Sequence, residues 1–98
     1  MVMSLSSLAL DAFLAVSKEL NFTKAAQSLN ITQSALSQRI MNLESELETS
    51  LFIRDRAGLR LTATAENLLR YCKTRNSLEG EFLSSLKSLD HNELVGPI

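Results

Sequence analysis

Four polar side chains share one face of a predicted helix in the middle of the chain. Thr32 is a typical N-cap residue, and an apolar stripe at helical spacing follows it from Leu36 to Leu47. The short, neutral side chains broadly opposite this stripe in the first two turns are Gln33, Ser34, Ser37 and Gln38. A glutamine can make two hydrogen bonds to an adenine edge, and a serine can bond several bases or a phosphate. These residue types are compatible with a surface that reads double-stranded DNA, although periodicity alone favours a merely solvated helix face.

Three arginines follow shortly after this helix: Arg54, Arg56 and Arg60. Two short apolar runs, residues 51–54 and 59–61, enclose a four-residue turn that ends in Gly58, which predicts a small β-hairpin with a basic tip. Such arginines can reach the sugar-phosphate backbone or an adjacent minor groove. Arg54 has an equally weighted alternative, because its guanidinium can instead form a structural ion pair with a carboxylate such as Glu44.

Two helices are predicted before this polar helix. An apolar stripe from Leu5 to Leu20 indicates the first, with Ser4 or Ser7 as its cap and Asn21 as its stop. Thr23 is expected to cap a second, short helix that contains two adjacent alanines. Lys24, near the start of that helix, is a candidate phosphate contact, although a lysine there is often only solvated.

A long helix is predicted from about Ala63 to Leu89, capped by Thr62. Its leucines and aromatic residues form a stripe that is too apolar for an isolated chain, which predicts a homodimer contact. The residues assigned to this contact are Leu68, Cys72, Leu78, Phe82, Leu86 and Leu89. Cys72 is expected to be a core or interface residue rather than a reactive thiol.

The order of these elements predicts the fold class: mainly α, a winged helix-turn-helix with a three-helix core and a small β-hairpin wing, followed by a long linker/dimerisation helix. We expect residues 1–62 to form the DNA-binding domain and residues 63–90 the linker helix. Residues 91–98, which contain Gly96 and Pro97, are expected to begin a hinge.

Composition excludes several other classes of protein. The chain has 98 residues, one cysteine and a formal net charge of −1, which is unusually low for a nucleic-acid-binding domain. No signal peptide, membrane-spanning run or metal-ligand spacing is present in the sequence, and its single histidine, His91, has no catalytic partners. We therefore expect a cytoplasmic, nucleoid-associated protein that is not an enzyme and that uses no cofactor in this segment.

The sequence resembles the N-terminal domain of LysR-type transcriptional regulators. The resemblance runs from about Leu8 into the last helix, and the segments that carry it are residues 21–26, 29–40, 43–44, 51–54 and 61–62. It implies that Gln33, Ser34, Ser37 and Gln38 face the major groove and that Thr23 and Lys24 lie near the DNA backbone. It also implies that two linker helices pair antiparallel in a dimer bound to a pseudo-palindromic site.

The same resemblance implies a larger C-terminal domain that senses a small-molecule effector, and a possible tetramer of the full-length protein. The chain is therefore expected to be a fragment, an engineered piece or a truncated gene product.

Three residues depart from the family pattern. Glu48 and Ala65 stand where the pattern has glycine, and Ala57 stands near the position of a basic residue at the wing tip. A glycine at position 48 would permit a left-handed helix cap, so Glu48 predicts either a longer helix or a changed turn. Arg56 or Arg60 would have to replace the missing tip residue. The alternative function is a winged-helix protein-interaction module without specific DNA binding.

Overall fold

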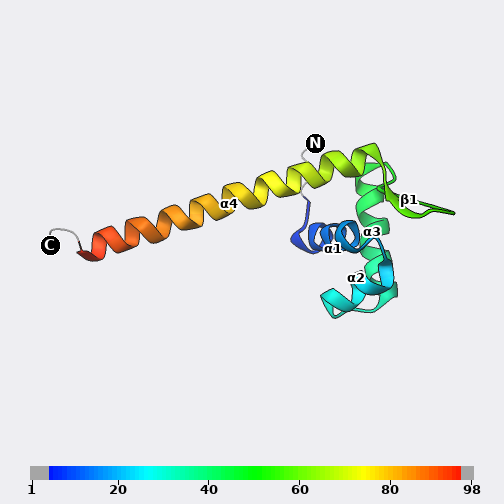
Figure 1. Cartoon of the computed structure of the whole chain (residues 1–98), viewed down its shortest axis with the longest axis horizontal. Coiled ribbons are helices and arrows are strands. Elements are labelled where there is room, and N and C mark those ends of the chain that lie inside the picture. Colours follow the sequence, from blue (N-terminus) through cyan, green and yellow to red (C-terminus); the bar gives the residue numbers. More distant parts are fainter. Residues whose placement is uncertain (1–4, 96–98) are drawn as a thin grey trace.

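The computed structural model describes the backbone of residues 5–95 and the side chains of residues 5–87. Its elements are α1 (Ser7–Glu19), α2 (Phe22–Leu29), α3 (Gln33–Leu47), β1 (Phe52–Asp55), β2 (Gly58–Leu61) and α4 (Ala63–Val95). Figure 1 shows α1, α2 and α3 packed together at one end, with the hairpin projecting from them and α4 extending in the opposite direction. This architecture confirms the predicted winged helix-turn-helix followed by a long helix.

The helix boundaries follow from side chains that satisfy free backbone N–H groups. Thr32 and Thr62 cap α3 and α4 as predicted, because their hydroxyl oxygens accept from the N–H groups of Ala35 and Ala65 at 3.0 and 3.1 Å. The cap of α1 is Ser6, whose Oγ accepts from the N–H of Ala9, and not Ser4 or Ser7.

The prediction for the junction between α1 and α2 is wrong. Asn21 was expected to end α1, but it caps α2, because its Oδ1 accepts from the N–H of Lys24 at 2.8 Å. Leu20 ends α1 in a left-handed conformation with φ of 51°. Thr23 therefore lies inside α2 instead of capping it, and its hydroxyl is available for another contact.

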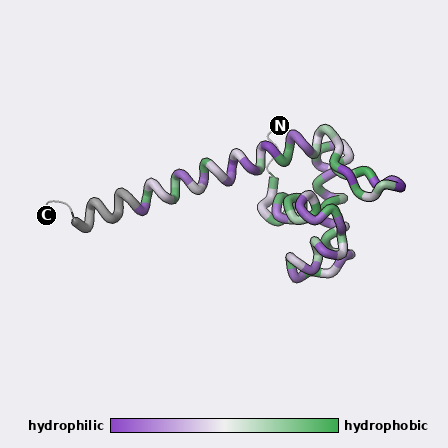
Figure 2. The backbone as a smooth tube through the Cα atoms, viewed as in Figure 1, coloured by the Kyte–Doolittle hydropathy of each residue, from purple (hydrophilic) through white to green (hydrophobic). Residues whose placement is uncertain are grey.

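The core lies where the three short helices meet the hairpin and the first turns of α4. Its largest fully buried side chains are Phe13, Val16, Leu36, Leu43, Leu51 and Cys72. Buried Ala25 and Ala26 allow α2 to approach its neighbours closely. In Figure 2 hydrophobic segments alternate with hydrophilic ones along these packed helices, as expected of helices with one buried face.

The hairpin pairs β1 with β2 in antiparallel register, with Phe52 opposite Leu61 and Asp55 opposite Gly58. Gly58 has φ of 117°, a conformation that residues with a side chain rarely adopt. The base of the hairpin is fixed to α3, because Oε2 of Glu44 accepts from the N–H of Leu51 at 2.7 Å.

Glu48 ends α3 at the position of the family's glycine without lengthening the helix. It adopts the left-handed conformation itself, with φ of 55°, and its N–H bonds back to the last turn of α3. Ala65 is fully buried, so the core accommodates the methyl group that replaces the second glycine. Neither departure displaces the wing from its predicted place after α3.

Helix α4 has two parts that differ in their surroundings. Leu68 and Cys72 are buried against the chain's own core and are not available for the dimer contact that the sequence predicted for them. Leu78, Phe82 and Leu86 are exposed, whereas the side chain of Leu89 lies outside the described residues. The helix continues to Val95, past the predicted end near Leu89 and into the segment expected to begin a hinge. None of the helices in the described part of the chain combines the length and the apolar character that a membrane span requires.

Candidate nucleic-acid interface

Helix α3 is divided into a buried apolar face and a polar face that the rest of the chain leaves open. Leu36, Ile40 and Leu43 anchor it in the core. Gln33, Ser34 and Gln38 are exposed and Ser37 is half-buried, so the predicted reading residues lie on the accessible side of α3. This division follows from the sequence spacing, because residues three and four apart share one face of a helix.

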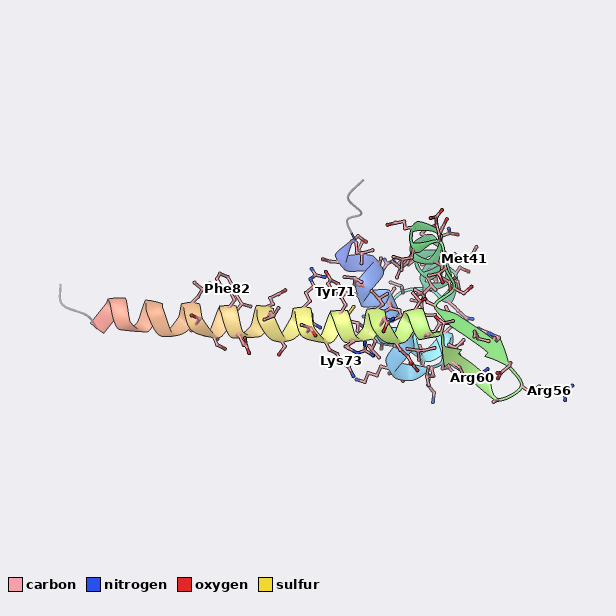
Figure 3. All side chains as sticks on the ribbon, turned by 90° about the horizontal axis from the view of Figure 1, so that it is seen from above. Met41, Arg56, Arg60, Tyr71, Lys73 and Phe82 are labelled. Carbon is pink, nitrogen blue, oxygen red and sulfur yellow. The ribbon has the colours of Figure 1, made fainter. Side chains whose placement is uncertain are left out.

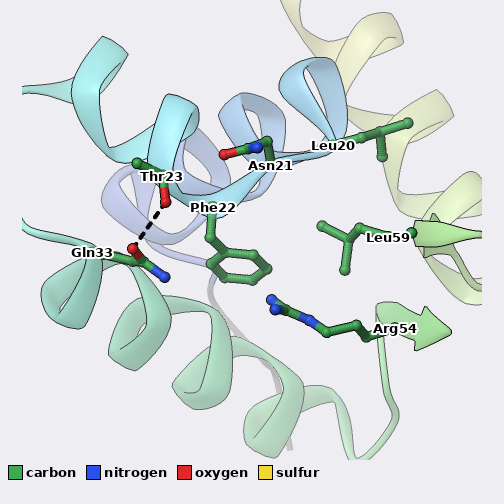
Figure 4. A pocket seen from close by; sticks show the side chains of 8 residues that line it. Leu20, Asn21, Phe22, Thr23, Gln33, Arg54 and Leu59 are labelled. Carbon is green, nitrogen blue, oxygen red and sulfur yellow. Dashed lines mark hydrogen bonds between the residues drawn. The ribbon is translucent and has the colours of Figure 1, made fainter. Parts of the chain in front are cut away.

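The two glutamines on this face are held by different neighbours. The hydroxyl of Thr23 donates to Oε1 of Gln33 at 3.0 Å, which connects α2 to the first turn of α3 (Figure 4). One turn further along α3, Nε2 of Gln38 donates to Oδ1 of Asn42 at 2.9 Å. Asn42 was not among the predicted site residues, although its position four residues after Gln38 could have indicated it.

A groove of about 280 Å³ lies between the start of α2, the start of α3 and the wing. Thr23, Gln33 and Arg54, three of the predicted site residues, line it together with Phe22 and Leu59. Figure 4 shows the amide nitrogen of Gln33 and the guanidinium of Arg54 directed into the space below the Phe22 ring. The structure thus brings together predicted site residues from three elements, with Thr23 and Arg54 separated by 31 positions in the sequence.

Arg54 contacts an aromatic ring instead of the carboxylate considered as its partner. Its guanidinium carbon lies 5.7 Å from the centroid of the Phe22 ring, within the range of a cation–π interaction. Glu44 uses its carboxylate to fix the backbone of Leu51. The stacking leaves the charge of Arg54 exposed at the edge of the groove.

A second groove, of about 280 Å³, runs along the other side of Arg54 between α3 and the hairpin. Ser37 and the exposed side chain of Met41 line it, together with Phe22, Phe52 and Leu59. Met41 was not among the predicted site residues. Its position makes it a candidate for apolar contact with a bound partner.

The remaining wing arginines, Arg56 and Arg60, are not among the residues that line either groove. Figure 3 shows Arg56 at the tip of the hairpin, directed away from the helices. Nη2 of Arg60 lies 2.6 Å from Oδ2 of Asp55, so Arg60 is paired within the wing. Asp55 also accepts from the N–H of Ala57 through Oδ1. The Ala57 hydrogen bond first, and then Arg60, hold the pKa of Asp55 below its ordinary value.

Two further predicted positions, Thr32 and Lys24, lie on the exposed surface. Thr32 uses its hydroxyl oxygen as the cap of α3, while its side chain stays exposed at the start of the polar face. Lys24 is exposed on α2. Among the described residues, no group of three or more histidine, cysteine, aspartate or glutamate side chains could hold a metal ion.

The comparisons with known proteins agree with this geometry. Residues 8–66 match the description "Bacterial regulatory helix-turn-helix protein, lysR family". The transcriptional regulator HdfR of Escherichia coli is 51% identical over 65 residues, which cover 66% of this chain and 23% of HdfR. The chain therefore spans about a quarter of the length of the curated relatives that it matches.

Solved structures extend the similarity into α4. The DNA-binding domain of BenM, crystallised with benA site 1 DNA, is 32% identical with a TM-score of 0.78, and the match covers 88% of this chain and 97% of that one. A mutant of OxyR from Corynebacterium glutamicum is 28% identical with a TM-score of 0.74, and the match covers 90% of this chain and 28% of that one. With its motif, its wing and its long helix all accounted for, this chain belongs to the lysR family of bacterial regulatory helix-turn-helix proteins.

Proposed function

We propose that the chain binds a specific sequence of double-stranded DNA as the N-terminal part of a transcriptional regulator. The observation that carries the proposal is the open polar face of α3, whose opposite face is buried in the core. A helix of this kind fits the major groove with its first turns against the base edges. The solved BenM domain, which is similar over 88% of this chain, is in complex with DNA, and this supports the same role here.

In this proposal the polar side chains and the arginines have separate tasks. Gln33, Ser34, Ser37 and Gln38 contact base edges, whereas Thr23, Lys24 and Thr32 lie at the DNA backbone. Arg54 and Arg56 supply positive charge beside α3 and at the wing tip. Since the net charge is only −1, we expect sequence recognition to depend more on the hydrogen bonds of α3 than on a basic patch.

We also propose that the distal part of α4 pairs with α4 of a second copy. Leu78, Phe82, Leu83 and Leu86 are all exposed apolar side chains in the single chain. Pairing would bury them and would place two copies of α3 on a pseudo-palindromic site. In a longer protein, a small-molecule effector would bind outside these 98 residues, and a tetramer could form there.

The proposed role needs no catalytic residue and no cofactor in this segment. It places the protein in the cytoplasm with the bacterial nucleoid, because a regulator of this family acts on DNA.

A fluorescence-anisotropy titration tests the proposal. Preferred duplexes would first be selected from a random pool, and binding to them would be compared with binding to random duplexes at several salt concentrations. We expect preference for the selected duplex, and an affinity that falls as salt rises because the protein displaces counterions from phosphates. Equal affinity for both duplexes, or binding that does not respond to salt, would contradict it.

Two alanine variants separate DNA reading from the alternative role as a protein-interaction module. The near-neutral charge and the internal pairing of Arg60 favour that alternative. Gln33→Ala and Ser37→Ala should each weaken specific binding by about 1–3 kcal/mol if they lose a base contact. Gln27→Ala, on the exposed surface of α2, is the matched control and should leave the ratio of specific to random binding unchanged.

A further inference from the structure

We propose that Thr23 is a positioning residue that restricts Gln33 to reading a guanine. This inference rests on the proposed DNA binding and adds a base preference to it. A free glutamine amide has both a carbonyl acceptor and two N–H donors, and that combination matches the N7 acceptor and N6 donor of adenine. The hydrogen bond from Thr23 changes which of these groups Gln33 can present.

The bond engages one of the two lone pairs of the Gln33 carbonyl and holds that oxygen toward α2. The Thr23 hydroxyl donates to Oε1 at 3.0 Å, and Figure 4 shows Nε2 on the side of the amide that points away from Thr23. Gln33 is exposed, so this nitrogen is accessible from outside the molecule. Held in this orientation, the side chain turns its carbonyl toward Thr23 and its N–H donors away from α2.

The surroundings of Gln33 reinforce this donor character. The guanidinium of Arg54, which can only donate, lines the same groove and is directed toward the same space. Asn21, another polar side chain of the groove, uses its Oδ1 to accept from the N–H of Lys24. The accessible groups of the groove therefore favour a base edge made of acceptors. In the major groove that edge belongs to guanine, with O6 and N7.

Gln38 provides a contrast on the same helix. It uses one N–H of its amide to bond Asn42 at 2.9 Å. Its Oε1 and its second N–H have no partner among the described residues, so Gln38 keeps the donor and acceptor pair that fits adenine. Two chemically identical side chains are thus prepared for different bases by their neighbours.

The hydroxyl of Thr23 can be removed without a large change in shape. Thr23 is exposed near the start of α2, and valine has the same branched outline but no donor. In Thr23→Val the Gln33 amide is free to turn its carbonyl outward, so adenine becomes acceptable. Thr23→Ser keeps the donor and should preserve the preference for guanine.

Selection from a pool of random duplexes, followed by sequencing, measures the preference directly on the 98-residue chain. Gln33→Ala and Gln38→Ala first identify which base pair depends on each glutamine. At the pair that depends on Gln33, we expect the unmodified chain to favour guanine over adenine roughly tenfold. Thr23→Val should reduce that ratio to about twofold or less, while the pair that depends on Gln38 keeps its preference.

Thr64→Val is the matched control, because Thr64 is an exposed residue in the first turn of α4 and is not among the residues that line the groove. It should leave both preferences unchanged, and circular dichroism would verify that each variant folds. If the unmodified chain prefers adenine at the pair that depends on Gln33, the inference is overturned while the proposed DNA binding stands. This outcome is decisive even if Thr23→Val does not fold. An undiminished guanine preference in folded Thr23→Val would overturn the inference as well. If the unmodified chain enriched no sequence, the proposed DNA binding would fail and the inference would fall with it.

Discussion

Asp55 and Arg60 form an ion pair across the wing, with 2.6 Å between Oδ2 and Nη2. They lie on opposite strands of the hairpin, and Asp55 is two positions beyond Ile53, the residue that pairs with Arg60. Both side chains remain accessible to solvent, so the pair contributes little to the stability of the fold. Its consequence is electrostatic: the carboxylate of Asp55 neutralises the guanidinium of Arg60, which could otherwise bind a phosphate.

Asp55→Asn should therefore strengthen the binding of DNA regardless of its sequence. The amide keeps an oxygen that can accept from the N–H of Ala57, but it no longer neutralises Arg60. If Arg60 then neutralises one more phosphate, the slope of log affinity against log salt should steepen by about 0.9. Anisotropy titrations of a random duplex at several salt concentrations would measure both the affinity and this slope.

Asp11→Asn is the control for that change, because it removes the same charge from an exposed position on α1. Its effect through net charge should be smaller, and it should leave the salt slope nearly unchanged. An equal change in both variants would show that the position of Asp55 in the wing is irrelevant.

The ion pair should persist throughout the neutral and mildly acidic range. Because the pKa of Asp55 is lowered in the folded chain, its stabilising contribution is present above the pKa of an unfolded aspartate and is lost as pH falls through the lower folded value. NMR titration of the carboxyl carbon should give a pKa below the ordinary aspartate value. Arg60→Ala should raise this pKa, and a pKa of Asp55 at the ordinary aspartate value would contradict the geometry.

Glu48→Gly should stabilise the fold. Glu48 adopts φ of 55° at the end of α3, which costs free energy for any residue with a side chain and very little for glycine. We expect the free energy of unfolding in urea to rise by about 0.5–1 kcal/mol. Glu46→Gly, inside the same helix, should lower it by about 1 kcal/mol. Destabilisation by both substitutions would indicate that residue 48 is not left-handed in solution.

Two residues of α4 should respond differently to substitution. Phe82 is 61% exposed, so Phe82→Glu should leave the single chain folded but weaken its association, as measured by sedimentation equilibrium. Leu68 is 8% exposed, and Leu68→Ala should lower the free energy of unfolding by about 2–5 kcal/mol. Association that survives Phe82→Glu would place the contact between copies elsewhere.

The sequence by itself determined the order of elements, the caps Thr32 and Thr62 and the polar face of α3. These features depend on helical periodicity and on hydrogen bonds between residues three or four apart, which local geometry dictates. The exchanged roles at the α1–α2 junction were missed because Leu20, an apolar residue without a turn signature, takes the left-handed position. Leucine does not favour the left-handed conformation, but the packing of the helices on either side of Leu20 overrides that preference.

Only the tertiary structure decided which side chains meet between elements. The crossing of α2 over α3 brings Thr23 to Gln33, the hairpin register brings Asp55 to Arg60, and the packing of the wing brings Arg54 over Phe22. It also divided α4 into a part that completes the core and a part that remains exposed, although both carry the same apolar spacing. Periodicity tells which face of a helix is apolar, but the path of the neighbouring chain decides which turns of that face are covered.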